Sequence, residues 1–67
     1  MFIEIDDILI NLDNVTAISR RNPVVNFCNY YLLLIETVDN RRWELKYETE
    51  EERDKKWEWL RGIVPKR

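Results

Sequence analysis

Segments rich in Ile, Leu, Val and aromatic residues fill most of the chain up to residue 47, and short polar turns separate them. Branched and aromatic residues at this density favour β-strands. The pairs Asp6-Asp7 and Asp13-Asn14 are typical of turns, because their side chains hydrogen-bond the local backbone. Pro23 marks a loop, since proline cannot donate a hydrogen bond to a sheet. Five strands are therefore predicted, at residues 2–5, 8–12, 15–20, 27–38 and 41–47.

The last two predicted strands form a hairpin around Asp39-Asn40. A two-residue turn would place Leu34 opposite Leu45, because antiparallel partners sum to a constant. One face of this hairpin then forms the core and carries Tyr30, Leu32, Leu34, Trp43, Leu45 and Tyr47. The opposite face is too apolar for ordinary solvent surface and is predicted to contact a partner; it carries Tyr31, Leu33 and Ile35.

A helix is predicted over Glu50–Ile63. Thr49 and Glu52 have the spacing of a capping box, in which each side chain accepts a hydrogen bond from the other residue's backbone N–H. When residues are placed at intervals of about 100°, one stripe of the helix is predicted to face the core. It consists of Arg53, Trp57, Leu60 and Val64, with Ile63 at its edge. Trp59 falls almost opposite this stripe. Pro65 is expected to stop the helix and leave Lys66-Arg67 as a basic tail.

These elements predict an α+β fold, a curved five-stranded antiparallel sheet or partial barrel closed by one C-terminal helix. The 67 residues are expected to form a single domain. A domain of this size buries only about 60% of the surface of its unfolded chain, so it needs additional stabilisation. Cys28 is the only cysteine and histidine is absent, which excludes an intrachain disulfide and a Cys/His zinc site. With these two excluded, self-association is the remaining way to stabilise so small a domain.

The chain offers little for catalysis. It has no histidine, and its hydroxyl groups have no evident base at a recognisable spacing. The acids of the first 19 residues, Glu4, Asp6, Asp7 and Asp13, match no calcium loop and are explained by turns. Cys28 has the parity of Leu32 and is expected in the core. We therefore expect no enzyme activity, no cofactor and no metal.

Charge and hydropathy restrict the cellular location of the protein and the kinds of partner it can bind. The formal net charge is −2 and the pI is about 5.1, so no global attraction to nucleic acid or anionic lipid is expected. No apolar run is long enough to cross a membrane, and the N-terminus carries acids where a signal peptide needs bases. A cytoplasmic protein without a membrane contact is predicted.

Two arginine pairs leave a nucleic-acid interpretation open. Arg20-Arg21 and Arg41-Arg42 flank a strand with aromatic residues such as Tyr31, and guanidinium groups beside stacking platforms bind single-stranded nucleic acid. The pairs lie toward opposite ends of the strand, so they would not form one short patch.

The segment Ile10-Asn11-Leu12-Asp13-Asn14-Val15 is followed by the predicted hairpin around Asp39-Asn40 and by the helix start Thr49-Glu50-Glu51-Glu52. In these features the chain resembles small bacterial or phage-encoded domains of pleckstrin-homology-like shape. This resemblance implies scaffolding or partner binding. The lipid-binding branch has basic residues in the first hairpin loop, where this chain has Asp6-Asp7, so phosphoinositide recognition is not implied. The order of elements is also similar to single-strand binders of the transcriptional-coactivator type, which dimerise.

The sequence thus predicts a non-enzymatic protein–protein interaction or regulatory module that forms a homodimer or joins a larger complex. The alternative is a single-stranded nucleic-acid-binding protein. Trp59 is the foremost predicted partner contact because large exposed aromatics are enriched at binding hot spots. The other predicted partner contacts are Ile63, Tyr31, Leu33 and Ile35, and the nucleic-acid candidates are Arg20, Arg21, Arg41 and Arg42.

Overall fold

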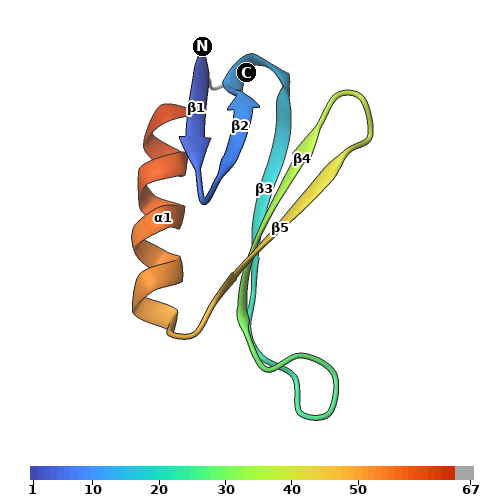
Figure 1. Ribbon diagram of the computed structural model, residues 1–67, viewed down its shortest axis with the longest axis vertical. Helices are drawn as coiled ribbons and strands as arrows, with labels where there is room; N and C mark the ends of the chain where they lie inside the picture. The colour runs from blue at the N-terminus through green and yellow to red at the C-terminus, as the bar shows by residue number, and fades with distance from the viewer. Residues whose placement is uncertain (65–67) are drawn as a thin grey trace.

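The computed structural model describes residues 1–64, which form five antiparallel strands and one helix (Figure 1). The strands lie in two sheets, a β1–β2 hairpin and a three-stranded sheet in the order β3-β4-β5. The α+β class with antiparallel strands and a C-terminal helix is confirmed, whereas the single five-stranded sheet or partial barrel is wrong. The strands are β1 (Phe2–Ile5), β2 (Ile8–Asn11), β3 (Val15–Arg21), β4 (Tyr31–Thr37) and β5 (Arg42–Tyr47), and the helix is α1 (Glu50–Ile63).

The β1–β2 hairpin turns at Asp6 and Asp7, as the sequence predicts. Both residues have positive φ angles, 47° and 69°, and Ile5 pairs with Ile8 across the turn. Two successive residues of this kind match the right-handed twist of the strands, which is why such turns close two-residue hairpins. Aspartate tolerates the left-handed conformation better than most residues. A 3-10 turn, Leu12–Asn14, then leads into β3.

The register of the β4–β5 hairpin differs from the predicted one by a single residue. Leu33, not Leu34, pairs with Leu45. The loop has three residues, since the Thr37 N–H donates to the Arg41 carbonyl oxygen at 3.0 Å and the Asn40 N–H donates to the Thr37 carbonyl oxygen at 3.1 Å. Asn40 has a φ of 64°, the left-handed conformation that ends such three-residue loops.

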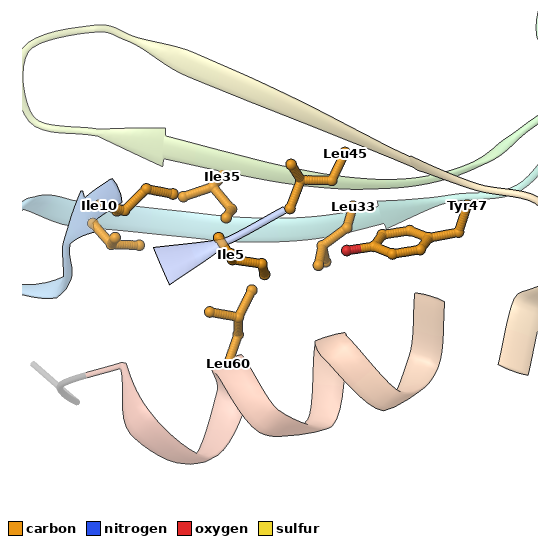
Figure 2. Close-up of a cluster of buried hydrophobic side chains, with 8 residues drawn as sticks. Ile5, Ile10, Leu33, Ile35, Leu45, Tyr47 and Leu60 are labelled. Carbon is orange, nitrogen blue, oxygen red and sulfur yellow. The ribbon is translucent and has the colours of Figure 1, made fainter. Parts of the chain in front are cut away.

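This shift exchanges the two faces of β4. Leu33 and Ile35 are 0% and 1% exposed and face the helix, so the expectation that they form a free partner surface with Tyr31 is wrong. Figure 2 shows Leu33 and Ile35 packed against side chains of the β1–β2 hairpin, β5 and α1. The core consists of Ile5, Ile10, Val15, Leu33, Ile35, Leu45, Tyr47 and Leu60. Leu32 and Leu34 lie on the outer face of the three-stranded sheet instead, where Leu34 is buried as predicted, at 3% exposed.

The helix begins as predicted, because the Thr49 hydroxyl accepts a hydrogen bond from the Glu52 N–H at 3.2 Å. Arg53 and Leu60 are buried, and Trp57 packs against the core. The predicted stripe is therefore the face that α1 buries. The predicted stop at Pro65 and the basic tail Lys66-Arg67 lie outside the described residues. No helix within residues 1–64 has the length and apolar character needed to cross a membrane.

Candidate interaction surface

A long loop joins β3 to β4 over residues 22–30, where the sequence predicts that a strand has already begun. Its tip is closed by an isolated pair between Val24 and Cys28, which exchange two backbone hydrogen bonds of 3.0 Å. The Phe27 N–H also donates to the Val24 carbonyl oxygen at 3.0 Å, and Asn26 has a φ of 69°. The predicted start of the strand at Phe27 is wrong, and this segment is a compact turn with its own hydrogen bonds.

The loop tip exposes large apolar side chains. Phe27 is 88% exposed and Val25 is 82% exposed, the highest values among the large hydrophobic residues of the described chain. Val24 and Tyr30 beside them are also exposed. The loop projects from one end of the molecule, which measures 36 × 23 × 23 Å (Figure 1). We call the exposed residues Val24, Val25, Phe27 and Tyr30 the apolar tip.

A groove with a volume of about 560 Å³ lies between this loop and the outer face of the three-stranded sheet. Leu32 and the nearly covered Leu34 of β4 form its apolar floor. The loop side of the groove is lined by Val24, Phe27 and Cys28. Cys28 is half-buried, so its predicted place in the core is wrong. Arg21 on β3 and Glu44 on β5 lie at the borders of the groove. A volume of this size is within the range of protein ligand sites.

Arg53 of α1 fixes the base of the loop. Its Nη1 group donates to the Arg21 carbonyl oxygen at 2.9 Å and to the Asn22 Oδ1 atom at 2.8 Å. Its Nε group donates to Asp54 at 3.0 Å, and its guanidinium lies 5.2 Å from the centre of the Tyr31 ring. Only 4% of Arg53 is exposed. The position of the loop is therefore coupled to the docking of the helix.

The four arginines predicted as nucleic-acid contacts do not form one surface. Arg20 lies on the helix side, 3.3 Å from Asp54 and 4.5 Å from the centre of the Trp57 ring. Arg41 pairs with Asp39 at 3.2 Å, and Arg42 pairs with Glu36 at 3.0 Å. Arg21 and Arg42 both line the groove, so one arginine of each predicted pair lies there. The basic side chains on the outer face of the sheet are those of Arg21, Arg42 and Lys46.

The remaining predicted contacts divide between surface and core. Trp59 is 41% exposed on the helix, with the Lys56 ammonium 5.6 Å from the centre of its ring. Ile63 is half-buried and packs against the core. Partner binding by Trp59 stays a prediction. A second exposed apolar pair, Phe2 and Leu9 at 63% and 66% exposed, lies on the β1–β2 hairpin.

Sequence reasoning missed Val25 and Phe27. The sequence feature that could have indicated this loop is the stretch from residue 22 to residue 35, which has no charged residue in a chain that is 36% charged. It is also longer than an ordinary strand and is interrupted by Pro23, Asn26 and Asn29. These interruptions indicate a loop followed by a strand.

Within residues 1–64, no three His, Cys, Asp or Glu side chains gather closely enough to hold a metal ion. Comparison with protein-family models, curated proteins and solved structures found no match.

Proposed function

We propose that this protein is a non-enzymatic interaction module that binds another protein through the apolar tip and the adjoining groove. The observation that carries this proposal is the exposure of Phe27 and Val25 on a loop that is ordered by its own hydrogen bonds. Exposed apolar groups are unfavourable in water, and a contiguous patch of them marks an interaction site.

The order of the loop supports the same conclusion. Residues that are already held in one conformation lose less entropy on binding than residues of a flexible loop. The bridge between Val24 and Cys28 holds the tip, and Arg53 holds the base. Phe27 is an aromatic anchor of the kind that contributes strongly at interfaces.

Site-specific photo-crosslinking tests the proposal. A photoreactive phenylalanine analogue is placed at position 27 in the full chain, inside the cells that produce the protein. We expect it to form a covalent adduct with a defined protein, because the Phe27 side chain would enter the interface. The matched control carries the same analogue at position 9, since Leu9 is also well exposed but lies on the β1–β2 hairpin.

A second variant checks that the adduct reports binding. Val25→Ser in the position-27 chain should lower the adduct yield at least about tenfold, the effect of losing roughly 1.4 kcal/mol of binding. Equal adduct yields at positions 9 and 27, or no adduct at position 27, would contradict the proposal.

Single-stranded nucleic acid is the second candidate partner. Phe27 and Tyr30 are exposed aromatics near Arg21 and Lys46, and bases stack on such side chains. Glu36 and Glu44 on the same sheet face, together with the net charge of −2, weaken this candidate. Fluorescence anisotropy with a labelled oligothymidine tests it. Binding that falls steeply with salt would favour nucleic acid, whereas no binding at low salt would exclude it.

A further inference from the structure

We infer that the partner at this surface is a second copy of the chain, and that two copies insert their apolar tips into each other's grooves. This inference rests on the proposed function and names its partner. The chain itself contains both parts of such a contact, since the apolar tip adjoins an apolar groove and two tip residues, Val24 and Phe27, also form the loop side of that groove. A two-fold axis between two adjoining complementary patches brings each patch onto the other in the partner copy.

The charges at the groove fit this arrangement. Arg21, Arg42 and Glu44 line the groove, and Arg42 is paired with Glu36. Within residues 1–64 neither Arg21 nor Glu44 forms an ion pair. Their opposite signs allow Arg21 of one copy to meet Glu44 of the other, and the two-fold axis makes this contact twice. The tip adds no repulsion, because residues 22–35 carry no charge.

The available area indicates a weak dimer. Exposed parts of the four side chains in the apolar tip amount to on the order of 500 Å² per copy, given that one aromatic side chain alone accounts for about 150–250 Å². The two tips alone would bury roughly 1,000 Å², the lower limit for a specific interface, and the groove walls would add to this area. A dissociation constant between about 10 μM and about 1 mM is therefore expected.

Analytical ultracentrifugation of the purified full chain, from about 10 μM to about 1 mM, tests the inference. The unmodified protein should shift from monomer to dimer within this range. The double variant Val25→Ser/Phe27→Ser should stay monomeric, because burial of its polar tip no longer contributes a favourable free energy. Leu9→Ser should dimerise like the unmodified chain. Association by the double variant equal to that of the unmodified chain would overturn the inference.

A charge exchange tests the pairing of the two copies. Arg21→Glu and Glu44→Lys should each weaken dimerisation at least about tenfold, and the double variant should recover it. The Arg21 side chain can be changed because only its backbone carbonyl binds Arg53. If both single variants dimerise like the unmodified chain, or the double variant shows no recovery, the proposed arrangement is wrong.

The crosslinking and sedimentation results separate the two proposals. A chain that remains monomeric at about 1 mM overturns the second copy as partner. If position 27 still captures a different protein in cells, the interaction module stands. If position 27 captures nothing, the interaction module falls as well. An adduct with twice the mass of the chain, together with a concentration-dependent dimer, supports both.

Discussion

At the scale of single residues, Arg53 is a charged side chain inside a domain with a small core. Removing a charge from water is costly unless hydrogen bonds and an opposite charge replace the solvent. Asp54 supplies the charge, and the Arg21 carbonyl and Asn22 amide oxygens accept two further hydrogen bonds. No buried side-chain nitrogen or oxygen atom of the described residues lacks a partner. The guanidinium therefore pairs with Asp54 through its Nε atom and joins α1 to the loop through its Nη1 atom.

Replacement of Arg53 by Met tests this role. The variant keeps an apolar stem of similar length but leaves the Arg21 carbonyl and the Asn22 side chain without their donor. We expect a loss of about 2–3 kcal/mol in the free energy of unfolding, measured by urea denaturation. Amide hydrogens of residues 22–30 should also exchange faster. Lys55→Met is the control, since Lys55 is exposed on the same helix. Equal stability of the two variants would contradict the anchor role of Arg53.

At the scale of elements, one turn residue decides which side of β4 faces the helix. A two-residue loop was predicted because Asp39-Asn40 has the composition of a tight turn. The chain instead adds Val38 to the loop, and Asn40 takes the left-handed conformation. The Thr37 hydroxyl donates to the Asp39 carboxylate, and this bond, with the charge of Arg41, lowers the pKa of that carboxyl below its ordinary value.

Substitutions at Asn40 measure the contribution of this turn. Asn40→Val places a β-branched residue at a φ of 64° and should cost on the order of 1–2 kcal/mol. Asn40→Gly should retain the stability of the unmodified chain or exceed it, because glycine adopts positive φ freely. Thermal unfolding followed by circular dichroism gives the comparison. A valine variant as stable as the glycine variant would mean that the loop does not depend on this conformation.

The helix and the turns of β1–β2 could be predicted from sequence, because capping residues and paired aspartates act through local chemistry. The face of β4 could not, since Leu32, Leu33, Leu34 and Ile35 are all apolar and either parity fits a core. The apolar tip was missed for a related reason. Val25 and Phe27 look like strand residues, and hydrophobicity alone does not distinguish a residue that packs inside from one that is held outside.

At the scale of the whole molecule, the two sheets share no backbone ladder and are joined by side chains. The Tyr47 hydroxyl of β5 donates to the Asp6 carboxylate in the β1–β2 turn. Burial of the phenol, and then its bond to Asp6, raises the pKa of Tyr47 above its ordinary value. Figure 2 places the Tyr47 ring at one end of the core.

This raised pKa predicts a loss of stability in alkaline solution. The fold favours the neutral phenol, so the stabilisation is complete below the unfolded pKa of about 10 and declines as the pH rises above it. Tyr47→Phe should lack this decline and should cost about 1 kcal/mol at neutral pH, since one hydrogen bond is lost. Urea denaturation of both chains between about pH 7 and pH 11 measures the difference. Parallel curves over this range would contradict the assignment.

The bonds between Arg53 and the start of the loop also link α1 thermodynamically to the proposed binding surface. If helix docking holds the loop in its binding conformation, then occupation of the loop must stabilise the docked helix by the same free energy. Hydrogen exchange of the backbone amides in α1 should therefore slow when a partner occupies the tip, although α1 packs on the other face of the sheet. The helix would report, from the opposite side of the sheet, whether the surface is occupied.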